Sequence, residues 1–160
     1  MPMIEGWEVS PDRKKVLEKM LSTDPIGEPL LVSKCQLQAD RGTIIASDNG
    51  FSWRIKMTGN TALIKAGKSK WVRWYDVNQI INEKPNKGMI KIEMFKRKKG
   101  ALVTKNGKPK VFRWRFILNR KKNEPKDHFK QRRQDFYRVM NEIFQRNKPD
   151  EIPAVSDSRM

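Results

Sequence analysis

Residues 110–146, KVFRWRFILNRKKNEPKDHFKQRRQDFYRVMNEIFQR, contain the two patterns that predict the fold class. The first is an alternation over residues 110–118, which is typical of a β-strand with one buried face. Its apolar side consists of Phe112, Trp114, Phe116 and Leu118. The second is a helical spacing over about residues 127–146, with an apolar stripe formed by Phe129, Phe136, Tyr137, Met140, Ile143 and Phe144. A strand followed by an amphipathic helix predicts a helix that packs on a sheet.

Upstream of this stretch the chain predicts a series of short strands. β-prone runs occupy residues 29–38, 43–47, 51–57, 61–65, 70–75, 89–96 and 101–104. Asp48-Asn49-Gly50 and Asn106-Gly107 are the strongest turn signals, because Asn and Gly tolerate positive φ. Residues 76–81 fit the end of a strand or one helical turn, and periodicity over so few residues does not decide between them.

The length of 160 residues is that of one domain with short ends. Ser10-Pro11 predicts the start of a short N-terminal helix, and Pro25 disfavours its continuation. We expect an N-terminal extension over residues 1–25, a domain over 28–147 and a polar, disordered tail over 148–160. The predicted fold class is α+β and mainly β: a curled antiparallel sheet or open barrel of about seven strands, closed by the C-terminal amphipathic helix.

Positive charge is concentrated in residues 96–133. This region holds sixteen Lys and Arg and two acids, which is +14 of the chain's net +17. The charges alternate with the apolar residues of a strand, so we expect a folded element to display them together. Such a surface predicts a polyanion or an acidic protein as partner. The candidate polyanion- or lipid-binding residues are Lys96, Arg97, Lys98, Lys99, Lys105, Lys108, Lys110, Arg113, Arg115, Arg120, Lys121 and Lys122.

The sequence offers no catalytic, metal or cofactor site. Cys35 is the single cysteine, which excludes an internal disulfide and cysteine-rich zinc sites. His128 is the single histidine and lies beside an acid at the predicted helix start, where a surface or capping role is usual. No phosphate-cradling glycine loop and no nucleophile–base pair is present. We therefore expect a protein that is not an enzyme and that holds no cofactor and no metal.

The chain predicts no transmembrane segment. No apolar run approaches the roughly 20 residues of a membrane span, and no signal peptide opens the sequence. With a single cysteine, these features favour a cytoplasmic protein, peripheral at the membrane if its basic residues bind lipid.

Five segments resemble successive parts of pleckstrin-homology-like (PH-like) domains. EPLLVSKCQL (28–37), GTIIASDNGFSWRIK (42–56) and WVRWYDVNQI (71–80) are similar to strands of GRAM-like and bacterial PH-like domains. FRWRFILN (112–119) and FYRVMNEIF (136–144) resemble the last strand and the closing helix. The resemblance covers about residues 28–147 and implies the PH-like superfold. An unrelated β-barrel with a C-terminal helix is the alternative.

The resemblance also implies classes of ligand. Many PH-like domains bind phosphoinositides through basic residues around the first hairpin, but here that hairpin has only Lys34 and Arg41, with Asp40 beside Arg41. The positive charge lies on the later hairpin and last strand instead. GLUE domains of the ESCRT machinery are PH-like adaptors for lipid and ubiquitin, so the resemblance includes an adaptor role.

These observations lead to three functional hypotheses. The first is a non-catalytic module that docks on anionic membrane headgroups and serves as an adaptor. The second in rank is a protein-interaction module of the GLUE type, with ubiquitin as a candidate partner. The third is nucleic-acid binding through the same basic residues. Trp71 and Trp74 lie on opposite faces of one predicted strand, so one of them is a candidate to stack on a base or to contact a partner, although strand Trp residues usually pack in a core.

Overall fold

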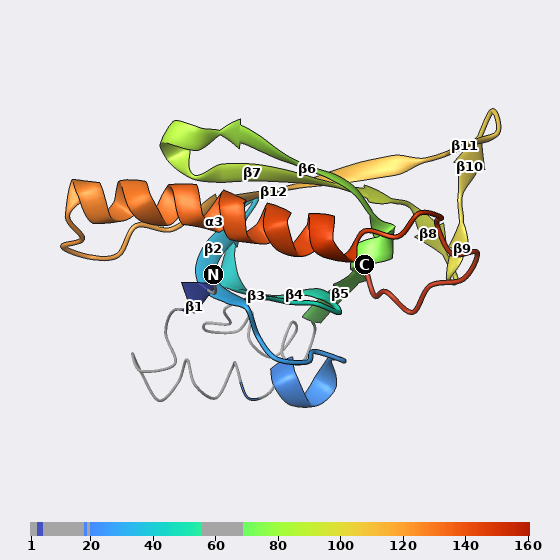
Figure 1. Ribbon diagram of the computed structural model, residues 1–160, viewed down its shortest axis with the longest axis horizontal. Helices are drawn as coiled ribbons and strands as arrows, with labels where there is room; N and C mark the ends of the chain where they lie inside the picture. The colour runs from blue at the N-terminus through green and yellow to red at the C-terminus, as the bar shows by residue number, and fades with distance from the viewer. Residues whose placement is uncertain (1–2, 5–17, 19, 56–68) are drawn as a thin grey trace.

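The computed structural model describes residues 3–4, 18, 20–55 and 69–160 (Figure 1). Within these ranges the strands and helices are β1 (Met3–Ile4), β2 (Leu31–Leu37), β3 (Asp40–Ser47), β4 (Gly50–Ile55), β5 (Ser69–Arg73), the 3-10 helix η1 (Trp74–Asp76), β6 (Val77–Lys84), the 3-10 helix η2 (Pro85–Lys87), β7 (Met89–Phe95), β8 (Arg97–Lys98), β9 (Ala101–Leu102), β10 (Thr104–Lys105), β11 (Lys108–Pro109), β12 (Val111–Leu118) and α3 (Lys126–Asn147). Residues 20–23 form the described end of a further helix.

Seven strands form a single antiparallel sheet in the order β5-β4-β3-β2-β12-β7-β6, and the short β1 adds to β2 in parallel. The first four strands and the last three meet where β12 pairs with β2. This seam runs only from Phe116, opposite Leu37, to Leu118, opposite Cys35, whereas β12 pairs with β7 from Val111 to Ile117. The N-terminal half of β12 is therefore held through β7 and extends beyond the seam.

The closing helix α3 fills the concave side of the sheet. Figure 1 shows α3 crossing the molecule between β3, β4 and β5 on one side and β6, β7 and β12 on the other. Its side chains Phe136, Met140 and Phe144 are buried, and Phe144 meets Trp74 with a centroid separation of 6.0 Å. Burial of each large apolar side chain contributes roughly 1.5–3 kcal/mol. The helical stripe in the sequence is thus the surface that closes the sheet.

Both ends of α3 are tied to the rest of the molecule. Near its start, Arg132 donates to the buried carboxylate of Glu124 over 2.6 Å. At its end, Arg146 Nε and Asn147 Nδ2 donate to Asp48 Oδ1 in the β3–β4 turn, over 2.9 and 2.7 Å. The hydrogen bond from Asn147, followed by that from Arg146, lowers the pKa of Asp48. The end of α3 is therefore bonded to the β3–β4 turn, and its start is bonded to the loop that precedes it.

The architecture confirms the predicted fold. A seven-stranded antiparallel sheet closed by a long C-terminal helix is the PH-like arrangement that the sequence resemblance implied. The predicted helix over 127–146 is α3. Neither alternative for residues 76–81 is correct, because only Asp76 belongs to the helical turn η1, and residues 77–81 are the beginning of the strand β6. The predicted strand at 61–65 and the helix start at Ser10-Pro11 lie outside the described residues.

The C-terminal tail differs from the disordered segment that the sequence predicted. Residues 153–160, which we call the strap, run from the β8–β9 arm, where the Ser156 N–H donates to Gly100 O over 2.9 Å, to β5, where the Trp71 N–H donates to Arg159 O over 2.9 Å. Two serines of the strap donate to Asp76, whose exposed fraction is 0%. The strap is polar, as disordered tails are, but its polar groups have specific partners on the folded sheet. Composition alone does not reveal such partners.

The hairpin between β7 and β12 divides into two arms. Three hydrogen bonds form a junction: Lys96 N–H to Lys110 O (2.8 Å), Lys110 N–H to Val103 O (2.8 Å) and Val103 N–H to Lys96 O (3.0 Å). One arm, β8–β9, turns at Lys99-Gly100, and the other, β10–β11, turns at Asn106-Gly107. All four turn residues have positive φ, between 51° and 83°. The predicted Asn106-Gly107 turn is confirmed, and the β8–β9 turn adds a second arm.

Candidate polyanion-binding surface

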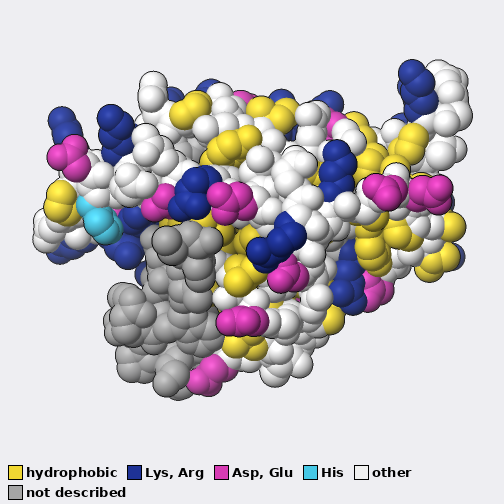
Figure 2. Space-filling model, in the orientation of Figure 1, with side chains coloured by type: hydrophobic (Ala, Val, Ile, Leu, Met, Phe, Trp, Pro, Cys, Tyr) yellow, Lys and Arg dark blue, Asp and Glu magenta, His cyan; other side chains and the backbone are white. Residues whose placement is uncertain are grey.

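Six lysines of the two arms form the most accessible group of positive charges. We call them the hairpin lysines: Lys96, Lys98, Lys99, Lys105, Lys108 and Lys110. All six are exposed, and none forms an ion pair with a residue that the structure describes. The β10–β11 arm projects beyond the sheet, and dark blue side chains mark its tip in Figure 2. These ammonium groups are available to an external anion.

The arginines in the middle of β12 are neutralised by the neighbouring strands. Arg113 Nε lies 2.9 Å from Glu93 on β7, and Arg115 Nε lies 2.9 Å from Glu83 on β6. Lys91 also contacts Glu83, at 3.1 Å. The hydrogen bond from Arg115, followed by that from Lys91, lowers the pKa of Glu83. Arg113 and Arg115 are exposed as predicted, but their charges are already paired.

The pairing at Glu93 is a balance between burial and hydrogen bonding. Burial raises the pKa of this carboxyl, and hydrogen bonds from Asn78 and Gln79 together with the charge of Arg113 outweigh it, so that the pKa is lowered. Asn78 Nδ2 donates over 2.6 Å. Glu93 is therefore charged, and its carboxylate oxygens have partners in Asn78, Gln79 and Arg113.

A second basic group lies in the loop before α3. Arg120, Lys121 and Lys122 are exposed there, and Lys126 and Lys130 continue the group into the first turns of α3. Arg120 Nη2 donates to Glu124 O over 2.6 Å, which holds the loop. No ion pair joins the four lysines to a described residue.

Glu124 organises this loop from the inside. It accepts hydrogen bonds from the Lys121 N–H (2.9 Å) and Arg132 Nη1 (2.6 Å), and it meets His128 Nδ1 at 2.6 Å. Burial raises the pKa of Glu124, and these partners, with the Lys121 N–H the largest, lower it to about 2. His128 is therefore an exposed partner of a carboxylate at the helix start, in agreement with the surface role expected from the sequence.

The two exposed groups lie at opposite ends of the molecule (Figure 1). The eight residues of β12 lie between the two groups and span a distance of about 26 Å at ~3.3 Å per residue. This exceeds the Debye length of about 8 Å at physiological salt, so the charges of one group are largely screened from those of the other. The sequence predicted that these residues are displayed together, and the structure instead divides them between the arms, the paired middle of β12 and the loop before α3.

Three predicted ligand-binding residues are buried and have structural roles. The Arg97 side chain is 4% exposed; its Nε donates to Asp76 Oδ1 over 2.9 Å, and its other nitrogens donate to Pro153 O and Ala154 O. Trp71 and Trp74 are 0% and 2% exposed, so neither ring is open for stacking. Trp74 instead donates to Ser47 O over 2.6 Å.

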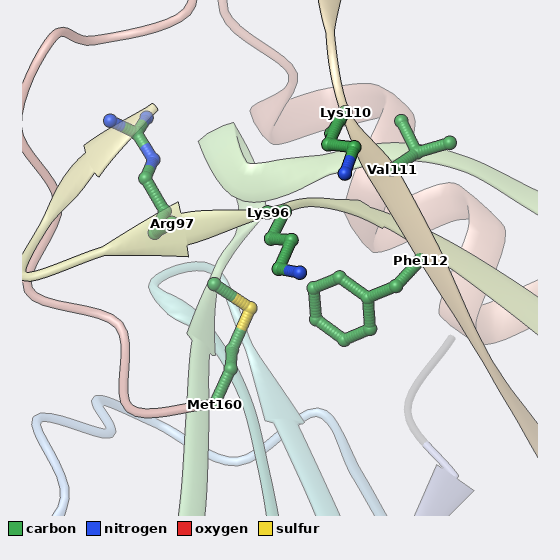
Figure 3. A pocket seen from close by; sticks show the side chains of 6 residues that line it. All are labelled: Lys96, Arg97, Lys110, Val111, Phe112 and Met160. Carbon is green, nitrogen blue, oxygen red and sulfur yellow. The ribbon is translucent and has the colours of Figure 1, made fainter. Parts of the chain in front are cut away.

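Two hollows accompany the basic groups. The first, with a volume of about 340 Å³, lies at the base of the arms and is lined by Lys96, Arg97, Lys110, Val111, Phe112 and Met160. Figure 3 shows the Lys96 and Phe112 side chains side by side, with the Arg97 guanidinium directed away from them. The second, of about 410 Å³, is lined by Arg120, Lys126, Asp127, Phe129, Lys130 and Arg133. Each hollow presents cationic groups beside a phenylalanine.

The described ranges contain no group of three His, Cys, Asp or Glu residues that could hold a metal ion. None of the helices in the same ranges is long and apolar enough to cross a bilayer.

Comparison with known proteins finds a match among solved structures, but none among protein families or curated proteins. A solved structure titled "PH domain from TgAPH" is similar to 80% of this chain and to 93% of its own chain, with 14% sequence identity and a TM-score of 0.31. The strand order and closing helix described above define a PH-like fold.

Proposed function

We propose that this protein is a non-catalytic PH-like binding module that docks on anionic membrane headgroups through the hairpin lysines, as an adaptor that also contacts another protein. The observation that carries the proposal is the exposure of all six ammonium groups on two arms, without an ion pair to any described residue. A projecting arm can approach a flat surface without a clash from the body of the sheet.

The number of lysines is sufficient for measurable binding. Each Lys near an anionic surface contributes about 1 kcal/mol, so engagement of four of the six contributes roughly 4 kcal/mol, close to a 1,000-fold increase in partition. The attraction is non-directional because lysine ammonium groups act as point charges. It therefore favours a surface of many anionic headgroups over a single stereospecific ligand.

The rest of the described surface supports a purely electrostatic attachment. Val155, which is 74% exposed, is the single large hydrophobic side chain in the described ranges that is strongly exposed. Insertion of apolar side chains into the bilayer therefore has no support from these ranges. Burial of Trp71 and Trp74 removes the support for base stacking by these two rings, and the described ranges show no apolar patch of the kind on which the ubiquitin hypothesis depends.

The short connection of the first hairpin, β2–β3, supports the proposal that anions bind at the later hairpin, between β7 and β12. Leu37 pairs with Asp40, so the β2–β3 connection is only Gln38 and Ala39. This short connection contributes no basic residue. The hairpin lysines, by contrast, surround two projecting turns.

Sedimentation with vesicles tests the proposal at physiological salt. The chain should bind vesicles that contain anionic phosphatidylserine and should not bind neutral phosphatidylcholine vesicles. A hairpin variant with Lys98→Glu, Lys105→Glu and Lys108→Glu should lose at least tenfold in partition. A matched variant with Lys121→Glu, Lys122→Glu and Lys126→Glu carries the same change in net charge and should stay within about threefold.

Equal binding to neutral and anionic vesicles, or binding to neither, would reject the proposal, and equal losses in the two variants would reject the role of the arms. Double-stranded nucleic acid is the second candidate, because its phosphates attract the same lysines with a steep dependence on salt. A gel shift of a duplex probe that the hairpin variant abolishes, in the absence of vesicle binding, would favour that candidate.

A further inference from the structure

The strap occupies a groove between β5 and the β8–β9 arm in the manner of an added strand. The Trp71 N–H donates to Arg159 O over 2.9 Å, and the Arg159 N–H donates back to Trp71 O over 2.6 Å. On the other side, Val155 pairs with Ala101, and the Ser156 N–H donates to Gly100 O over 2.9 Å. Figure 1 shows the C-terminal segment running from the arm to β5. The strap thus pairs with the outer edge of β5 at Trp71, through an isolated antiparallel bridge.

A buried carboxylate accepts hydrogen bonds from two hydroxyl groups of the strap. Asp76, in η1, has an exposed fraction of 0%. Its Oδ2 accepts hydrogen bonds from the Ser156 hydroxyl and, over 2.6 Å, from the Ser158 hydroxyl. Its Oδ1 is held by Arg97, which also donates to the carbonyl of Pro153. Two hydroxyls at positions i and i+2 of an extended segment are therefore matched to one oriented carboxylate.

Asp157, between the two serines, and Arg159, after them, pair with groups of opposite charge. Asp157 forms an ion pair with Arg73 Nη2 at 2.6 Å and accepts a hydrogen bond from Tyr75 over 3.1 Å. The hydrogen bond from Arg73 is the main reason that the pKa of Asp157 is lowered to about 2. Arg159 forms an ion pair with Asp24, which is 5% exposed.

The groove therefore recognises the order hydroxyl, acid, hydroxyl, base. Four consecutive strap residues supply it: Ser156, Asp157, Ser158 and Arg159. Three of their partners lie at the end of β5 and in η1, namely Arg73, Tyr75 and Asp76, and the fourth, Asp24, lies in the segment before β2. Main-chain pairing with an edge strand, combined with side-chain selection, is the general mode of extended-peptide recognition.

Most of the contacts that hold the strap can be exchanged. Apart from the partly buried Met160, the contacts above are hydrogen bonds and ion pairs, and Val155 in the middle of the strap is 74% exposed. Release of this segment therefore breaks mainly polar contacts, together with the packing of Met160 against the core. A segment of another protein with the same four residue types can make the same contacts and complement the same charges.

We propose that the groove formed by β5, η1 and the β8–β9 arm is a binding site for an extended segment of a partner protein with the pattern Ser-acid-Ser-Arg, and that the strap occupies this site in cis. The proposal is independent of the hairpin lysines and of membrane attachment. The strap then acts as a competitor that a partner segment must displace.

Fluorescence anisotropy with a labelled peptide of residues 150–160, DEIPAVSDSRM, tests this inference on the full chain. The strap variant Ser156→Ala, Ser158→Ala, Arg159→Ala should bind the peptide at least tenfold more tightly than the natural chain, because the natural strap competes at high effective concentration. A peptide with the same three alanines should bind neither protein. In the strap variant, a further Arg73→Ala should weaken the peptide about fivefold or more, and Lys121→Ala should not.

Amide hydrogen exchange at Trp71 reports whether the strap is released. Exchange should be slow in the natural chain, faster in the strap variant and slow again when peptide saturates the variant. Absence of saturable peptide binding, binding of the alanine peptide with equal affinity, or unchanged Trp71 exchange in the variant would overturn the proposal. A concentration-dependent dimer that the strap variant abolishes would assign the groove to a second copy of the chain and would also overturn it.

Discussion

Replacement of Arg97 by methionine separates its structural role from the ligand-binding role that the sequence predicted. The guanidinium is 4% exposed and pairs with Asp76, which is 0% exposed. Removal of one member of a buried ion pair leaves the other charge uncompensated, at a cost of about 3–5 kcal/mol. The hydrogen bonds to Gly100 O, Ala154 O and Pro153 O are lost as well. We expect Arg97→Met to lower the free energy of unfolding by about 4 kcal/mol.

Urea unfolding followed by tryptophan fluorescence measures this loss, because Trp71 and Trp74 are buried. With a urea dependence of roughly 2 kcal/mol per M, the midpoint should fall by about 2 M. Lys98→Met in the same arm is the matched control and should change the free energy by no more than about 0.5 kcal/mol, since Lys98 is exposed.

A double-mutant cycle with Asp76→Asn identifies the origin of the effect. If the two side chains act as a pair, the double variant should be more stable than the sum of the single losses predicts, with a coupling of about 2 kcal/mol. A cost below 1 kcal/mol for Arg97→Met, or strictly additive losses, would refute the assignment of Arg97 to the structure. Arg97 would then return to the set of candidate ligand-binding residues.

Three further predictions follow from other parts of the molecule. Glu124 has a pKa of about 2, below its ordinary 4.5, so the ionised carboxylate stabilises the fold above about pH 4.5. This contribution to the free energy of unfolding, up to about 3 kcal/mol, is lost as the pH falls toward 2. Glu124→Gln should flatten the dependence of the urea midpoint on pH in that window, and an unchanged dependence would contradict the role of this carboxylate. Phe116 is fully buried against Phe51 and Trp53, so Phe116→Ala should cost about 3–5 kcal/mol in calorimetry, and a loss under 1 kcal/mol would contradict its place in the core. Vesicle partition should fall at least tenfold between 0.1 and 0.5 M salt, as measured by sedimentation, and a salt-independent partition would argue against attachment through lysines.

The elements that could be predicted from the sequence are those with a periodic pattern. The alternation of β12 and the helical stripe of α3 are local consequences of which face is buried, so residues 110–146 sufficed to predict the last strand and the closing helix. The Asn106-Gly107 turn was equally visible, because both residue types favour positive φ. The turn at Lys99-Gly100 was not, since lysine gives no such signal although its φ is 51°.

The functional residues were harder to place because their state depends on contacts between distant segments. Arg113 is paired because the register of β12 sets it opposite Glu93. The Arg97 side chain is buried because it pairs with Asp76, which lies 21 residues earlier in the chain. Asp76 in turn accepts hydrogen bonds from serines 80 and 82 residues later, which gives the polar tail specific contacts with the fold. Local charge identifies which residues are basic, but it does not show which of them are already neutralised.

The tethering of α3 at Glu124 and at Asp48 has a consequence for the design of inhibitors. The helix covers the concave face of the sheet, and the two hollows that the structure describes lie at the base of the arms and beside the loop before α3. Compounds that interfere with this protein should be sought among those that mimic an extended peptide or a multivalent anion, because its periphery is where other molecules can gain a hold.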